Sequence, residues 1–125
     1  MAGEQMHELA IAESIAEVVA KRANEHGATH VALVRLRIGE ASGVVPDSLT
    51  LCFEMVASLD PLLTGARLAV DSVPHRAHCR GCDCEFAVRD FVAQCPACGE
   101  WSDEIVSGTE LQVMDMEIDT RQEGV

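Results

Sequence analysis

The chain has 125 residues, enough for one compact domain or for one domain with a small metal-stabilised appendage. Apolar residues make up 48% of it, but with three Phe, one Trp and no Tyr the core must be mainly aliphatic. Its 21 acidic and 9 basic residues give a formal net charge of −12. Such a surface repels the phosphate backbone of nucleic acids, so we expect no nucleic-acid partner.

The expected compartment guides the interpretation of the cysteines. Residues 1–5 show no basic stretch followed by an apolar one, and no later run approaches the roughly 20 apolar residues that span a bilayer. We therefore expect a cytoplasmic protein without a membrane attachment. Thiols stay reduced there, so the six cysteines favour metal binding or catalysis over disulfide bonds.

The first half of the chain predicts a helix, a strand and a second helix. Residues 6–26 carry apolar side chains at helical spacing, and Gly27 provides a left-handed stop. These apolar side chains are Leu9, Ile11, Ile15, Val18, Val19 and Ala23. Residues 29–39 alternate as in a strand, whose expected buried face consists of Ala32, Val34, Leu36 and Ile38. Pro46 suits the first turn of the second helix, which should end before Asp60.

The second half predicts two further strands, Arg67–Val73 and Glu110–Ile118. The apolar pattern of the latter changes phase near Val113 and Met114, and a β-bulge would reconcile its two parts. Because a two-stranded hairpin alone is only marginally stable, we expect the last strand to return to the sheet of the first two.

Two matched cysteine pairs predict a zinc site. The pairs Cys79–Cys82 and Cys95–Cys98 both have the spacing Cys-x-x-Cys, and the twelve residues between them suffice for a short hairpin. Zn²⁺ favours four tetrahedral ligands, and two thiolates at this spacing can occupy adjacent vertices. Four thiolates leave no open coordination position, so we expect a structural and not a hydrolytic zinc ion.

Together these elements predict an α+β fold: a small three-stranded sheet with two helices, plus an inserted four-cysteine zinc-ribbon-like module. Residues 75–103 would form the zinc-binding domain, while residues 1–74 and 104–125 would form the main α+β domain. Near the cysteine pairs, Cys84 is either a spectator or a ligand that exchanges into the site. We expect His75 and His78 to be solvated turn residues in preference to ligands.

A series of short motifs extends over nearly the whole chain. Met6-His7-Glu8 opens the first helix, Arg37-Ile-Gly-Glu40 ends the first strand, and the sequence Gly-Val-Val-Pro-Asp-Ser-Leu occupies residues 43–49. Followed by the paired cysteines, this order resembles the nickel-insertion accessory proteins of hydrogenase maturation, the HypA/HybF family. The resemblance covers residues 6–118.

The resemblance implies a nickel metallochaperone, which is not an enzyme. It would accept Ni²⁺ from a nickel-binding GTPase accessory protein and deliver it to the large-subunit precursor of a [NiFe] hydrogenase, as a monomer or a homodimer. The family's nickel motif maps onto His7 and Glu8, which would make the α+β domain the nickel-binding one. An imidazole, the backbone amides of both residues and a terminal amine could supply the tetragonal nitrogen set that Ni²⁺ accepts.

The position of this motif departs from the family, in which it begins at the first residue. Here residues 1–5 precede it, so the terminal amine lies away from His7, and Glu8 or Glu40 would complete the ligand set. Alternatively, translation starts at Met6, because codons for Gly3-Glu4 can resemble a ribosome-binding site. We expect the start at Met6, with a cloning remnant as a further alternative.

Two other classes of function explain less of the sequence. A zinc-ribbon module that binds only proteins would explain the cysteine pairs and the acidity, but not Met-His-Glu at a helix start. An enzyme has little support, because the chain shows no nucleophile elbow, no phosphate-binding loop and no open zinc site.

Overall fold

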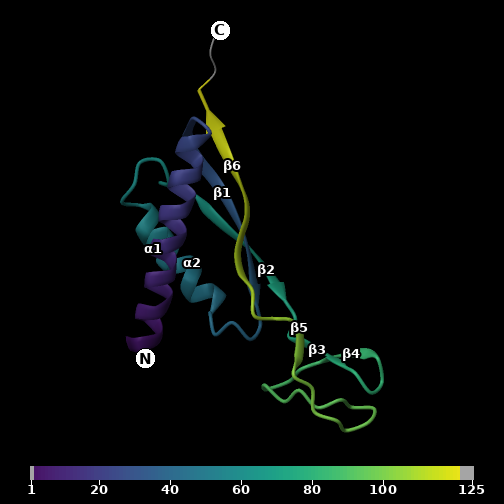
Figure 1. Cartoon of the computed structure of the whole chain (residues 1–125). Helices are drawn as coiled ribbons and strands as arrows, with labels where there is room; N and C mark the ends of the chain where they lie inside the picture. Colours follow the sequence, from purple (N-terminus) through teal and green to yellow (C-terminus); the bar gives the residue numbers. More distant parts are fainter. Residues whose placement is uncertain (1, 122–125) are drawn as a thin grey trace. The chain divides into compact units, whose positions relative to one another are not determined.

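The computed structural model describes residues 2–121, with side chains from His7 onward, and Figure 1 shows their arrangement into helices and strands. In chain order the elements are α1 (Ala2–Glu25), β1 (Ala28–Gly39), α2 (Pro46–Ala57), β2 (Arg67–Val73), β3 (Arg76–Cys79), β4 (Cys84–Ala87), β5 (Glu104–Ser107) and β6 (Leu111–Thr120). One three-stranded sheet has the order β2-β1-β6, and a smaller one has the order β4-β3-β5. The predicted α+β fold is thereby confirmed, including the return of the last strand to the first sheet.

The chain divides into two compact units. The first comprises Met1–Leu36, Val45–Val70 and Val113–Val125, and the second comprises Arg37–Val44 and Asp71–Gln112. The assignment of nickel to a domain of residues 1–74 and 104–125, and of zinc to residues 75–103, stays a prediction. Among the described residues, neither helix combines the length and the apolarity that crossing a bilayer requires.

Helix α1 in the first unit starts earlier than predicted, at Ala2 instead of residue 6, in a stretch whose Ala, Glu and Gln residues favour helix. Its buried stripe follows a three-to-four-residue period and consists of Glu8, Ala12, Ile15, Ala16, Val19 and Ala23. Val18 was expected on this stripe, but it lies on the neighbouring face and is 51% exposed. Gly27 ends the helix with a φ of 71°, as predicted.

Strand β1 is buried in a pattern that differs from strict alternation. Val34, Leu36 and Ile38 are buried as predicted, but Ala32 is exposed and Val31 is buried in its place. The amide of Val31 donates a hydrogen bond to the carbonyl of Leu62 at 2.9 Å, outside the strand pairing. The segment after α2 thus lies against the start of β1 at Val31, which accounts for the burial of this residue.

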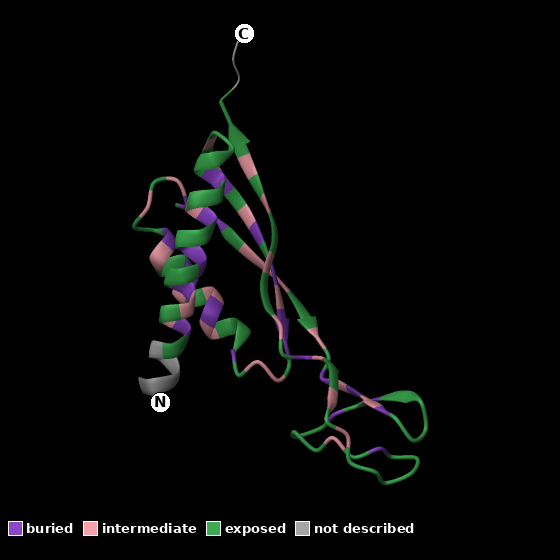
Figure 2. Cartoon of the chain, in the orientation of Figure 1, coloured by how far each residue is buried: buried purple, intermediate pink, exposed green. Residues whose placement is uncertain are grey.

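Helix α2 begins at Pro46, as predicted, and buries Leu49, Phe53 and Ala57, which lie four residues apart on one face. It lies next to α1 on one side of the three-stranded sheet, and the buried parts of both helices appear in purple in Figure 2. After the helix, the carbonyl of Asp60 accepts hydrogen bonds from the amides of Leu63 and Thr64.

In β6 the half-buried side chains are Val113, Met116 and Ile118, while Met114 is 46% exposed. The burial phase thus changes between Val113 and Met116, although the predicted β-bulge itself stays a prediction. On the exposed side, Arg35 of β1 donates to Asp115 at 2.7 Å and to Glu117 at 3.1 Å.

Gly39 and Gly108 in the second unit allow three chain segments to pack with their backbones in direct contact. The amide of Gly39 donates to the carbonyl of Glu110 at 2.8 Å, and the amide of Ala41 donates to that of Gly108 at 2.7 Å. A Cβ atom on Gly39 would fall on the backbone of Gly108, and one on Gly108 would fall on the backbone of His75. Only glycine leaves room at these two positions.

We expect Gly39→Ala to destabilise the protein by at least the ~1–3 kcal/mol typical of overpacked sites, because backbone atoms cannot rotate away as a side chain can. Urea unfolding followed by circular dichroism measures this loss. Gly65→Ala is the control, since it meets no atom within 4 Å and should cost only the ~1–2 kcal/mol of its left-handed conformation. Equal losses in the two variants would contradict the proposed steric cause.

Candidate metal centres

The four paired cysteines come together in the second unit. Cys79 ends β3 and pairs with Cys84 at the start of β4, so the turn between these strands carries Cys82. The Sγ atoms of Cys79, Cys82, Cys95 and Cys98 all lie within 4.8 Å of one another. The distance is 3.6 Å from Cys79 to Cys98 and 3.9 Å from Cys82 to Cys95. A tetrahedron with Zn–S bonds of about 2.3 Å has sulfur–sulfur edges of about 3.8 Å, so the cluster has the right size for zinc.

A tight turn shapes the second cysteine pair. The amide of Gly99 donates to the carbonyl of Cys95 at 2.8 Å, and the amide of Cys95 donates to the carbonyl of Glu100. Backbone N–H groups of Cys98 and Ala97 point at the sulfur of Cys95 and lower the pKa of its thiol to about 6. One ligand is therefore prepared as a thiolate, the form that binds metal.

The thiol of Cys82 resists ionisation, because it lies among other thiols. The neighbouring thiol of Cys98, followed by that of Cys95, raises the pKa of Cys82. A divalent metal removes this conflict, because its charge stabilises several thiolates at once. Four sulfur donors in a tetrahedral cluster are typical of structural zinc, so the donor set fits that ion.

A small apolar cluster includes two of the four cysteines. Ala77, Phe86 and Val88 are buried together with Cys79 and Cys95, whereas Cys82 and Cys98 are exposed. One thiol of each pair is thus shielded and one faces solvent. So few apolar side chains bury little surface, which makes a bound metal the main stabilising element available to the module.

Three further side chains near the pairs, His78, His75 and Cys84, have different surroundings. His78 faces Glu104 through Nδ1 at 2.7 Å and Asp83 through Nε2 at 3.0 Å, and the contact with Glu104 is the first cause of its raised pKa. His75 was expected to be solvated, but it is only 8% exposed and its ring lies 5.8 Å from that of Phe91. Cys84 is exposed and lies outside the four-sulfur cluster.

The two residues of the predicted nickel motif differ sharply in exposure. The side chain of His7 is 56% exposed, whereas that of Glu8 is only 2% exposed, and His7 Nδ1 lies 3.8 Å from Glu8 Oε2. The same Oε2 accepts a hydrogen bond from the amide of Val45 at 3.1 Å. Val45 precedes α2, and a valine side chain cannot cap a helix, so a carboxylate from α1 supplies negative charge at the α2 N-terminus.

Sequence reasoning missed this contact, although the sequence contained a signal for it. Glu8 precedes Ala12, Ile15 and Val19 by four, seven and eleven residues, and this spacing places it on the buried stripe of α1. The structure also affects the predicted amide ligands. His7 and Glu8 lie inside α1, where each amide bonds to the carbonyl four residues earlier, so amide ligation requires the first turns to open.

We expect Cys95→Ser to remove the bound metal from the cysteine cluster, because it replaces the ligand best prepared as a thiolate. Cys84→Ser is the matched control, since Cys84 lies outside the cluster, and it should retain one metal ion per chain. Elemental analysis of the purified proteins measures both contents. Retention of metal by the first variant, or its loss from the second, would contradict this assignment.

We expect Glu8→Ala to destabilise the first unit by about 1–3 kcal/mol, because it leaves the amide of Val45 without its acceptor. Glu8→Gln retains an oxygen acceptor and should lose less. Glu13→Ala, an exposed residue on the same helix, should stay within about 0.5 kcal/mol of the parent. Chemical denaturation ranks the three variants, and a loss in Glu8→Ala no larger than in Glu13→Ala would show that the contact contributes nothing.

Comparison with known proteins adds the family to this geometry. The family model "Hydrogenase/urease nickel incorporation, metallochaperone, hypA" matches residues 6–118. The hydrogenase maturation factor HypA of Geobacter metallireducens is 45% identical over 114 residues, which cover 91% of this chain and all of that protein. Its counterpart from Roseiflexus sp. is 41% identical over 113 residues, covering 90% of this chain and 91% of that protein.

Solved structures agree with the observed fold. The solution structure of the Ni metallochaperone HypA from Helicobacter pylori has a TM-score of 0.66 at 19% identity, covering 91% of this chain and 98% of that one. A second solution structure of a HypA protein gives 0.67 at 20% identity. The family is one of metallochaperones and not of enzymes, and the predicted resemblance is confirmed. The chain belongs to the HypA family of nickel-incorporation metallochaperones that serve hydrogenase maturation.

Proposed function

We propose that this protein binds Ni²⁺ through His7 and Glu8 and delivers it for assembly of the [NiFe] hydrogenase metallocentre. In the same proposal, Cys79, Cys82, Cys95 and Cys98 hold a structural zinc ion. The observation that carries the proposal is the family match over residues 6–118, which includes both the Met-His-Glu motif and the two cysteine pairs.

The contrast between the two candidate centres supports different roles for their metals. A structural ion needs a full set of ligands that are partly shielded from solvent. The four sulfurs form such a set, and two of the four cysteines are buried. A delivered ion must remain reachable by an acceptor protein, and the imidazole of His7 is more than half exposed. Imidazole nitrogen and carboxylate oxygen, which face each other here at 3.8 Å, are both donors that Ni²⁺ accepts.

The partners follow from this role. A metallochaperone for hydrogenase maturation must bind both a source and an acceptor of the metal. We propose a nickel-binding GTPase accessory protein as the source and the hydrogenase large-subunit precursor as the acceptor. Both interactions would take place in the cytoplasm, with the chaperone as a monomer or a homodimer. The net charge of −12 supports protein partners over nucleic acid.

We expect His7→Ala to abolish stoichiometric Ni²⁺ binding without changing the zinc content or the helical signal, because the His7 side chain is largely exposed. Isothermal titration of the zinc-loaded protein with Ni²⁺ measures the binding. The control is His26→Ala, which removes an exposed imidazole just after the other end of α1 and should bind nickel like the parent.

If His7→Ala bound one Ni²⁺ with unchanged affinity, the nickel site would have to lie elsewhere, with His75 and His78 as the next candidates. If neither the parent nor the variants bound Ni²⁺, a zinc-ribbon module that binds only proteins would become the better description.

A further inference from the structure

Helix α2 exposes a second apolar stripe that the packing of the first unit leaves uncovered. Its buried face carries Leu49, Phe53 and Ala57. On another side, Leu51 and Met55, together with Leu59 just beyond the helix, are 62%, 59% and 85% exposed and recur every four residues. A helix that is apolar on more than one face is normally covered on each of them.

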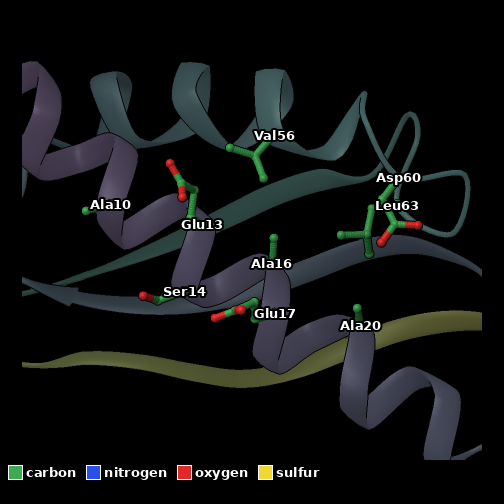
Figure 3. A pocket seen from close by; sticks show the side chains of 9 residues that line it. All are labelled: Ala10, Glu13, Ser14, Ala16, Glu17, Ala20, Val56, Asp60 and Leu63. Atoms are coloured by element: carbon green, nitrogen blue, oxygen red, sulfur yellow. The ribbon is translucent and has the colours of Figure 1, made fainter.

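A groove between the two helices lies beside this stripe. The groove has a volume of about 700 Å³, and Figure 3 shows the side chains that line it from α1 and from α2 and the turn that follows it. Ala16, Ala20, Val56 and Leu63 are among its apolar lining residues. Val56, which lines the groove, directly follows Met55 of the stripe in α2, so the two features adjoin at this point of the helix. The small alanine side chains allow another chain to approach closely.

The charges around this surface are acidic. Glu13 and Glu17 of α1 and Asp60 after α2 line the groove. Residues 45–66 contain Asp47, Glu54 and Asp60 but no Lys, Arg or His. Lys21, one turn beyond Glu17, is not among the lining residues. An occupant must therefore offer apolar side chains flanked by positive charges. A second copy of this chain would bring a net charge of −12 against these same acids, and anionic lipid would likewise be repelled.

We propose that the stripe Leu51–Met55–Leu59 and the adjoining groove form a docking surface for a basic amphipathic helix of a partner protein. From Leu51 to Leu59 the stripe covers nine residues, a rise of about 12 Å at helical spacing, which matches rows of apolar residues spaced by three and four on a bound helix. Basic residues beside this row would pair with Glu13, Glu17 and Asp60. The surface involves neither metal centre, so this inference stands apart from the proposed nickel delivery.

The test uses the full zinc-loaded chain and a synthetic peptide of about 18 residues, with leucines at helical spacing and lysines at the other positions. A control peptide of the same composition spreads its leucines evenly around the helix. NMR titration should show the patterned peptide binding at least about tenfold more tightly, with shifts at Leu51, Met55, Leu59 and the groove. Equal binding of the two peptides, or shifts confined to other regions, would overturn the proposal.

Matched variants localise the interaction. Met55→Ser combined with Leu59→Ser should weaken binding of the patterned peptide about tenfold or more, while Val106→Ser, which alters a side chain that is 49% exposed in the other unit, should not. Glu13→Gln combined with Glu17→Gln should weaken binding and reduce its dependence on salt. An unchanged affinity in both double variants would overturn the proposal. So would sedimentation that shows a dimer of this chain lost in Met55→Ser, because the occupant would then be a second copy.

Discussion

A single buried carboxylate links the two helices of the first unit. Glu8 of α1 is only 2% exposed and accepts a hydrogen bond from Val45, which stands at the start of α2, 37 residues further along the chain. Helix α2 has no side-chain cap of its own, so Glu8 of α1 adds its negative charge to that of Asp47 in the first turn of α2. A buried acid is unfavourable unless it is paired, and the amide of Val45 provides a partner for the carboxylate of Glu8. The buried carboxylate of Glu8 therefore holds the start of α2 against α1 through this hydrogen bond.

The motifs that carry the family resemblance gain physical meaning from such contacts. Glu8 belongs to the first motif and Val45 to the third, and one hydrogen bond joins them. Gly39 belongs to the second motif, and it must be glycine because the backbone of Gly108 leaves no room for a Cβ atom. The paired cysteines form one cluster of four sulfurs. In this chain, contacts between distant segments thus account for Glu8 and Val45, for Gly39 and for the paired cysteines.

The sequence predicted those features that depend on neighbouring residues. Pro46 marks the start of α2, the range Arg67–Val73 is that of β2, and the spacing of the cysteines predicts their pairing. The periodicity of apolar residues predicted burial wrongly where a segment distant in the sequence packs against the residue. Ala32 was expected to be buried in place of Val31, whose amide bonds to the carbonyl of Leu62 beyond α2. His75 is buried because Phe91 lies beside its ring and Gly108 against its backbone, which no local pattern around residue 75 contains.

The position of Glu8 has a consequence for the proposed nickel site. If Glu8 ligates Ni²⁺ beside His7, the metal and the amide of Val45 compete for the same carboxylate. Nickel binding and the seating of the α2 N-terminus are then linked, and thermodynamic reciprocity requires each to change the free energy of the other. The proposed docking surface lies on that same helix, so a partner that shifts α2 would alter the surroundings of Glu8. One buried carboxylate would in this way connect partner binding to the affinity for the metal, without direct contact between the partner and the ion.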